Sequence, residues 1–125
     1  MAFEALEEKR VYRRAEELGD MVWEVVAPWE WFAKRSVGLQ WTRSTDSIGA
    51  NIAEAGGRYH PADVKNFLYH ARGSLRETKF WLRRAHKRNL IDEVTFQKLN
   101  SEIELLSKEI NGSINHQKAR IKKTA

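Results

Sequence analysis

The stretch from Gln40 to Tyr59 constrains the fold most, because two rows of residues advance along it with the spacing of an α-helix. The polar row is Ser44, Ser47, Asn51, Glu54 and Arg58, and the apolar row beside it is Trp41, Thr45, Ile48, Ile52 and Ala55. A buried polar group without a partner costs about 1–3 kcal/mol, so an ordered polar row predicts hydrogen bonds across a helix interface. We therefore expect this helix to lie between other helices; the alternative is a row that is simply solvated.

The residues after this helix predict where it ends and where the next one begins. Gly56 and Gly57 suit the left-handed backbone at which many helices stop. His60 precedes a proline and is biased away from helical backbone, whereas Pro61 suits the first position of a new helix. Within that next helix, Gly73 predicts a close approach of another backbone.

Four amphipathic helices account for the apolar periodicity of the chain, which shows no alternating strand pattern. Their expected ranges are residues 3–34, 40–59, 61–88 and 93–117. Pro28 kinks or ends the first helix, residues 34–39 form a short connection, Asp92 is the N-cap of the last helix, and Val94 begins its apolar row. These helices predict an all-α fold, an antiparallel up-down four-helix bundle.

An aromatic cluster surrounds the break at Pro28 and has two interpretations. Its members are Trp23, Trp29, Trp31 and Phe32. They form either a core end-cap that seals the bundle or an exposed patch for docking or for stacking of bases.

Length and composition predict one domain outside the membrane. The chain has 125 residues, enough for a single core, and we assign 1–117 to the bundle and 118–125 to a basic tail into which the last helix frays. No apolar run approaches the roughly 20 residues of a membrane span, and the N-terminus is acidic where a signal peptide is basic. The absence of cysteine excludes disulfides and thiolate chemistry and fits a cytoplasmic protein.

Positive charge is concentrated in one segment. The whole chain has 22 basic and 17 acidic residues, but residues 61–90 have eight basic and two acidic ones. Such a field favours a polyanionic partner, either RNA or DNA. The candidate nucleic-acid-binding residues are Arg72, Arg76, Lys79, Arg83, Arg84, Lys87, Arg88, Lys118, Arg120, Lys122 and Lys123.

No sequence motif indicates catalysis or metal binding. Di-iron sites in four-helix bundles need a Glu three residues before a His, and the residues at that place are Gly57, Phe67, Arg83 and Ser113. Zinc-protease, phosphate-loop and nucleophile-elbow motifs are also missing. Asn51 and Glu54 with nearby Arg58 fit a structural network better than a catalytic pair. We therefore expect no enzymatic activity, no metal and no cofactor.

Two longer motifs resemble a known family. They are SIGANIAEAGGR at residues 47–58 and FLYHARGSLRE at residues 67–77. They resemble the four-helix-bundle proteins encoded in intervening sequences of bacterial 23S ribosomal RNA genes, whose usual pattern is Ser-Ile, Asn-Ile-Ala-Glu-Gly, a following Arg, and later Ala-x-Gly-Ser-Leu-x-Glu. Ala55 stands where that family usually has its first Gly. The resemblance extends from about Val11 to about Ile114.

The resemblance implies a left-handed up-down bundle that assembles into a ring-like homopentamer with a basic surface. The same family includes the accessory variability determinant proteins of diversity-generating retroelements, pentamers that bind nucleic acid and a partner reverse transcriptase. The role of most other members is not established, so the resemblance supports fold better than function. The matched motif positions are Ser47, Asn51, Glu54, Arg58, Ser74 and Glu77, which we interpret as holding helices together or lining a subunit boundary.

Two functions are compatible with this sequence. The leading hypothesis is a non-enzymatic nucleic-acid-binding accessory protein that contacts the RNA or DNA backbone and assists a reverse transcriptase of a retroelement. The alternative is a protein–protein interaction scaffold with an acidic partner and no direct role with nucleic acid.

Overall fold

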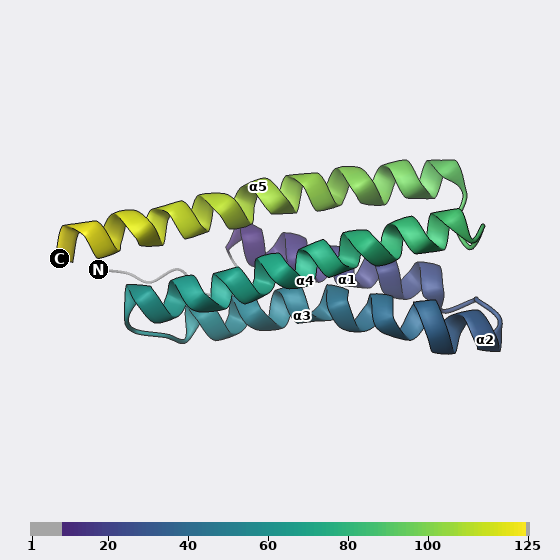
Figure 1. Cartoon of the computed structure of the whole chain (residues 1–125), viewed down its shortest axis with the longest axis horizontal. Helices are drawn as coiled ribbons and strands as arrows, with labels where there is room; N and C mark the ends of the chain where they lie inside the picture. The colour runs from purple at the N-terminus through teal and green to yellow at the C-terminus, as the bar shows by residue number, and fades with distance from the viewer. Residues whose placement is uncertain (1–8, 125) are drawn as a thin grey trace.

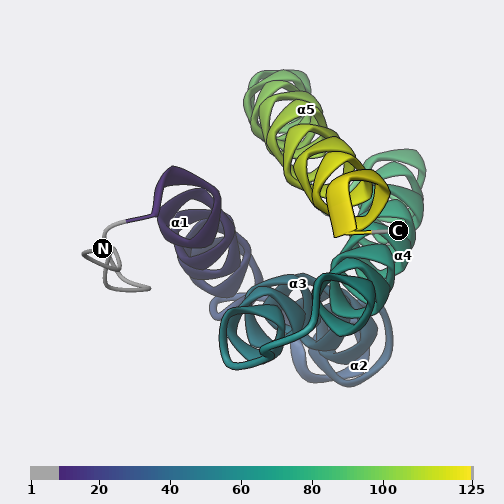
Figure 2. The same ribbon diagram turned by 90° about the vertical axis from the view of Figure 1, so that its left-hand side faces the viewer.

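The computed structural model describes residues 9–124, which form four long helices and a short helical segment (Figure 1). The elements are α1 (Arg10–Val26), α2 (Trp31–Ala33), the π-helix η2 (Lys34–Gly38), α3 (Leu39–Gly56), α4 (Pro61–Lys87) and α5 (Glu93–Thr124). Consecutive long helices run antiparallel, and the described residues contain no strand. Seen along the bundle, the order around the core is α1, α3, α4, α5 (Figure 2). The predicted all-α four-helix bundle is confirmed.

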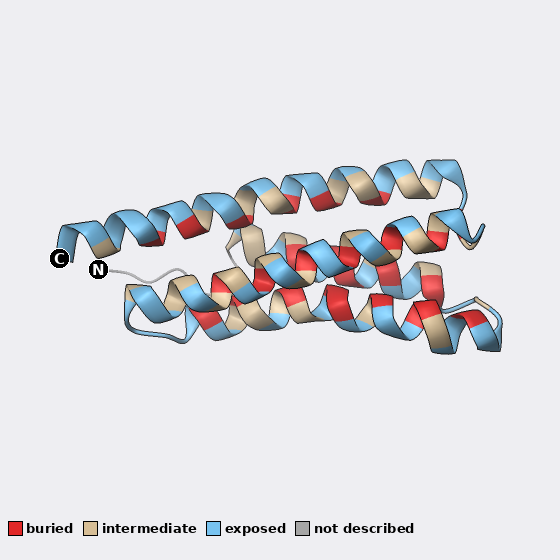
Figure 3. Ribbon diagram, viewed as in Figure 1, coloured by how far each residue is buried: buried red, intermediate tan, exposed pale blue. Residues whose placement is uncertain are grey.

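The core is built from one apolar stripe on each long helix (Figure 3). Trp41, Ile48 and Leu82 are fully buried, and burial of each such side chain contributes about 1.5–3 kcal/mol. Val94 was expected in this stripe but is 78% exposed. It lies in the first turn of α5, where the next inward position is taken by Phe96.

The predicted starts of α4 and α5 are confirmed. His60 has an extended backbone (φ −85°, ψ 134°) and Pro61 is the first residue of α4. The Asp92 carboxylate accepts a hydrogen bond from the Thr95 N–H at 2.8 Å, which makes Asp92 the N-cap of α5. This hydrogen bond also holds the pKa of Asp92 below its ordinary value.

The predicted end of α3 is correct in place but wrong in conformation. Gly57 has φ −89° and ψ −3°, so it is not left-handed. Its N–H donates to the Glu54 carbonyl at 3.1 Å and closes the last turn without a change of hand. Among the described residues, the positive φ of 60° belongs to Asn89, after α4.

The predicted connection at residues 34–39 is also wrong, because this segment is helical. The Glu30 carboxylate accepts hydrogen bonds from the N–H groups of Phe32 (2.9 Å) and Ala33 (2.6 Å), so a new helix starts there and continues through η2 into α3. Gly38 serves close packing instead of ending a helix. A Cβ at Gly38 would lie 2.7 Å from Cγ1 of Val26 at the end of α1.

Two further expectations differ from the structure. The last helix does not fray at Gln117, which is buried, but continues to Thr124; Arg120 Nη1 donates to Gln117 Oε1 at 2.9 Å across this point. Gly73 makes no close approach to another helix of the described chain, since a Cβ there would meet nothing within 4 Å. The first helix ends before Pro28 as expected, and its predicted residues 3–8 lie outside the described part of the chain.

The aromatic cluster divides between the two interpretations. Trp29 packs inside, with its ring stacked 6.0 Å from that of Trp41. Trp23, Trp31 and Phe32 are 64–72% exposed. The end-cap interpretation is therefore right for Trp29 and wrong for the other three. No helix among the described residues has the length and apolar character needed to cross a bilayer.

Candidate nucleic-acid interface

A row of cations runs along the outer edge of α4. Arg72, Arg76, Lys79, Arg83 and Lys87 follow one another at three or four residues and therefore share one side of the helix. Two contacts place this side next to α5. Lys79 Nζ pairs with Glu104 Oε1 at 2.6 Å, and Arg72 Nη1 donates to Asn111 Oδ1 at 3.3 Å.

The row continues onto the end of α5. Lys118 and Lys122 follow Asn111 by two and three helical turns and share its side of α5. Because α4 and α5 are antiparallel, this end of α5 lies beside the start of α4, where Lys65 extends the row (Figure 1). We call the whole set the basic face: Lys65, Arg72, Arg76, Lys79, Arg83 and Lys87 of α4 with Lys118 and Lys122 of α5. Its part on α4 is about 33 Å long.

The other four candidate residues lie off this row. Arg84 and Arg88 are turned further around α4, and Arg120 and Lys123 point to other sides of α5. Arg84 nevertheless joins a concavity at the end of α4. The lining residues of that concavity are Arg83, Arg84, His86, Lys87 and Asn89. None of them is acidic, so the concavity suits an anion.

Most cations of the basic face are not neutralised by the protein. Lys79 is paired with Glu104, and its hydrogen bond lowers the pKa of that carboxyl. Arg76, Arg83 and Lys87 make no ion pair within residues 9–124. This face therefore presents charges that are available to an anion such as a phosphate group.

Sequence reasoning missed the aromatic residues of this surface. The Tyr69 ring lies between two cations, 5.8 Å from Lys65 Nζ and 4.8 Å from Arg72 Cζ. Phe80 is 52% exposed and lies one turn from both Arg76 and Arg84. The helical spacing of these aromatics relative to the basic row was the available signal.

The polar row of α3 is used mainly within its own helix. Asn51 Nδ2 donates to the Ser47 carbonyl at 2.8 Å, and Arg58 Nη2 donates to Glu54 Oε1 at 2.6 Å. The expected hydrogen bonds of Asn51 and Glu54 across a helix interface are therefore not formed among the residues that the structure describes.

Contacts between α3 and α4 come from residues beside and within the motifs. The hydroxyl groups of Ser44 and Thr78 lie 3.1 Å apart across the two helices, and the Thr78 hydroxyl also donates to the Ser74 carbonyl at 2.8 Å. The Arg58 guanidinium lies 4.6 Å from the centre of the Phe67 ring. Glu77 is exposed on α4.

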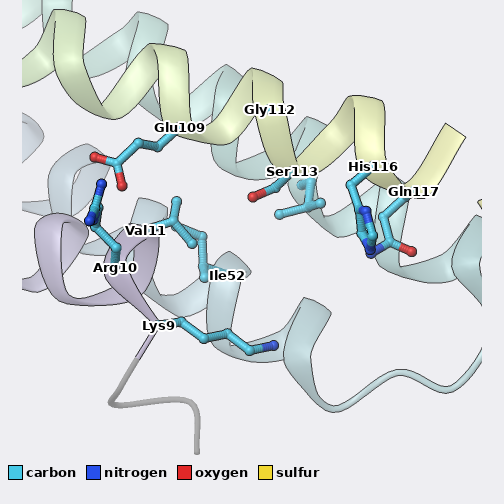
Figure 4. A pocket seen from close by; sticks show the side chains of 10 residues that line it. Lys9, Arg10, Val11, Ile52, Glu109, Gly112, Ser113, His116 and Gln117 are labelled. Carbon is cyan, nitrogen blue, oxygen red and sulfur yellow. The ribbon is translucent and has the colours of Figure 1, made fainter. Parts of the chain in front are cut away.

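A separate cavity of about 440 Å³ opens where α5 runs past the beginning of α1 (Figure 4). Its lining includes Glu109, Ser113 and His116 of α5. Glu109 is bound by Arg14 of α1, and this hydrogen bond raises the pKa of Arg14. Within the described residues, Ser113 and His116 are not hydrogen-bonded to each other, so the cavity does not present a joined nucleophile and base. The described residues also contain no cluster of three metal-binding side chains.

Together, the fold and this surface define a small four-helix-bundle protein with a charged edge between its last two helices. The chain matches the family model of the 23S rRNA-intervening sequence proteins over residues 7–112, and it belongs to that family. It is similar to a crystal structure of a protein of unknown function from the S23 ribosomal protein family of Bacteroides thetaiotaomicron. The identity is 25%, the TM-score is 0.74, and the alignment covers 83% of this chain and 97% of the other. No curated protein sequence matches this chain.

Proposed function

We propose that this protein is a non-enzymatic accessory protein that binds RNA or DNA through the basic face. The observation that supports it is the row of cations on α4, in which Arg76, Arg83 and Lys87 make no ion pair in the described chain. Lys and Arg contacts to phosphate position a nucleic acid without reading its bases, so binding is weakly sequence-specific. A reverse transcriptase of a retroelement is the partner protein that the family resemblance suggests for such an accessory role.

Assembly of several copies would strengthen the binding of nucleic acid. We propose a ring-like homopentamer, in which five basic faces would act on one polyanion and convert modest single-site attraction into avidity. Multi-angle light scattering tests the assembly directly, because the mass of the particle gives the number of 14.6 kDa chains. A monomer would exclude the ring but would leave the basic face of each chain intact.

The experiment that tests binding is a salt titration of affinity by fluorescence anisotropy, with a structured RNA and a matched DNA duplex. Counterion release predicts a steep loss, about 10³–10⁵-fold between 50 and 200 mM salt if six to ten phosphates are contacted. The double variant Arg76→Glu with Arg83→Glu should weaken binding and flatten the salt slope. Arg10→Glu with Arg13→Glu is the matched control, since it reverses two exposed arginines on α1, diagonal to α4. Absence of binding at low salt, or equal losses in both variants, contradicts the proposal.

An interaction scaffold is the second candidate, supported by the exposed aromatic end. Trp23, Trp31 and Phe32 are largely exposed, and Trp23 lines an apolar groove with Val26 and Leu39. Exposed apolar groups that gather in one place are typical of protein-binding surfaces. Under this proposal, Trp31→Ala lowers affinity for a protein partner such as a reverse transcriptase. The wild-type protein and the Arg76→Glu variant both show no binding of nucleic acid.

A further inference from the structure

Phe80 is the one large apolar side chain of α4 that is markedly exposed. Its ring packs against Trp81 at a centroid distance of 4.9 Å with an interplanar angle of 83°. Half of its surface stays open to solvent. Arg76, Arg83 and Arg84 lie one turn away along the helix, so cations flank the ring on both sides.

Tyr69 lies three turns earlier on the same side of α4, but it is partly buried and packs against the core. It is eleven residues before Phe80, which corresponds to about 16 Å along the helix. Lys65 and Arg72 lie over its ring. Between the two aromatics, Gly73 carries no side chain, and no atom of residues 9–124 outside its own helix turn lies within 4 Å of where a Cβ would be. The Phe80 end of this surface is therefore open, whereas the Tyr69 ring is already in contact with two cations.

From this exposed ring and the cations beside it we infer that the basic face binds single-stranded nucleic acid, with an unpaired base stacked on Phe80 and phosphates held by the neighbouring arginines. The inference rests on the proposed function and adds the class of ligand. Aromatic rings interleaved with cations are the usual platform for single strands, because every base has a face that stacks. The bases of a duplex are already stacked and cannot use this ring, so unpaired segments bind more tightly than duplex.

The surroundings of Phe80 favour a nucleic acid over a protein partner. An apolar protein surface placed on Phe80 would also cover Arg76, Arg83 and Arg84 and remove their charges from water without a partner. The other strongly exposed aromatics of the described chain, Trp23, Trp31, Phe32 and Tyr59, lie on α1, on α2 or in the turn before α4, whereas Phe80 lies among the cations of α4. A phosphate backbone satisfies the arginines, and a base covers the ring.

The test compares Phe80→Ala with wild type on three labelled ligands at two salt concentrations: a 20-nucleotide oligouridine, a 20-base-pair duplex and an abasic oligodeoxynucleotide of the same length. Loss of one stacked base lowers affinity for oligouridine by about 5- to 150-fold. Affinity for the duplex and for the abasic strand stays within about twofold, because those complexes depend on phosphates alone. Phe80→Trp should keep or raise the oligouridine affinity, and Phe80→Leu, which keeps apolar bulk without an aromatic face, should lose it.

The outcomes separate the two proposals. Equal affinity of the variants for oligouridine, or equal loss for all three ligands, overturns stacking on Phe80 while salt-dependent binding still supports the basic face. A change in particle mass of Phe80→Ala by light scattering also overturns it, since the ring would then belong to a contact between copies. Absence of salt-dependent binding by the wild-type protein to any ligand contradicts the proposed function itself.

Discussion

The inner and outer sides of α4 differ in burial and in how their polar groups are satisfied. On the inner side, Leu75, Thr78 and Leu82 are buried, and the Thr78 hydroxyl is satisfied by Ser44 of α3 and by its own helix. On the outer side, exposed arginines stand in a row, and Phe80 leaves half of its ring in water. The inner side of α4 thus has its apolar surface buried and its hydroxyl group hydrogen-bonded within the chain, whereas the outer side leaves charges and an aromatic ring exposed to solvent.

The difference shows which residues of α4 stabilise the fold and which do not. Burial and hydrogen bonds account for the inner side, whereas like charges spaced by four residues destabilise a helix by about 0.2–0.5 kcal/mol per pair. Arg72 with Arg76 and Arg83 with Lys87 are such pairs. The basic face therefore costs stability in the isolated chain, which fits a surface kept for a ligand.

The largest expected contrast is between a core aromatic and the exposed one. Trp41→Ala should lower the free energy of unfolding by about 3–5 kcal/mol, because Trp41 is fully buried and stacks on Trp29. Phe80→Ala should cost about 1 kcal/mol or less, since half of the ring is already exposed. Urea denaturation measures both values. Similar losses for the two variants would erase the distinction between the inner and outer sides.

Two glycines sharpen the comparison next. Gly38→Ala should destabilise by about 1–3 kcal/mol, because the new Cβ would lie 2.7 Å from Val26. Gly73→Ala on the outer side should instead stabilise by up to about 1 kcal/mol, since alanine favours helix and meets nothing there. Thermal denaturation checks both signs. A stabilised Gly38→Ala variant would show that the contact between α1 and η2 is looser than the structure indicates.

The polar contact of the inner side is a smaller term. Thr78→Val keeps the shape but removes the hydroxyl that faces Ser44, and we expect a loss of about 1 kcal/mol. A double-mutant cycle with Ser44→Ala isolates the coupling between the two hydroxyls. Additive effects of the two substitutions would mean that α3 and α4 are joined by apolar packing alone.

The smallest expected effect depends on pH and lies between α1 and α3. Partial burial raises the pKa of the Asp46 carboxyl, and repulsion from Asp20 of α1 raises it further. Both residues line a groove between α1 and α3, and Glu16 lines it too. The folded protein therefore binds this proton more tightly than the unfolded chain does. The contribution of Asp46 to stability increases as pH falls through its folded pKa and levels off below about 3.8, the ordinary value.

Asp46→Asn tests this sign by urea denaturation at several pH values. The variant should be more stable than wild type near neutral pH, and the difference should shrink as the solution is acidified. The control is Glu24→Gln, which changes an exposed carboxylate of α1 that does not line this groove. A difference in the free energy of unfolding between the two proteins that stays constant across the pH range would show that the pKa of Asp46 is not raised in the folded protein.

Local signals predicted most of the fold. The three-to-four spacing of Ile48, Ile52 and Ala55, the proline at Pro61 and the cap at Asp92 each act within one or two turns, so their consequences follow from neighbouring residues. Residues 34–39 were wrongly predicted as a connection, because the role of Gly38 depends on close packing against Val26 of another helix. Val94 was misassigned because periodicity does not show where the partner helix ends.

The sequence by itself determined that this protein has four amphipathic helices, a basic third helix and the two motifs of its family, because helical period, caps and composition are written in adjacent residues. Only the tertiary structure decided which cations of different helices lie on the same surface. The antiparallel packing of α4 on α5 brings Lys118 and Lys122 into line with Lys65 and turns Arg120 away. The side of each helix that faces a neighbour depends on packing between distant segments, and that packing determines the surface a ligand meets.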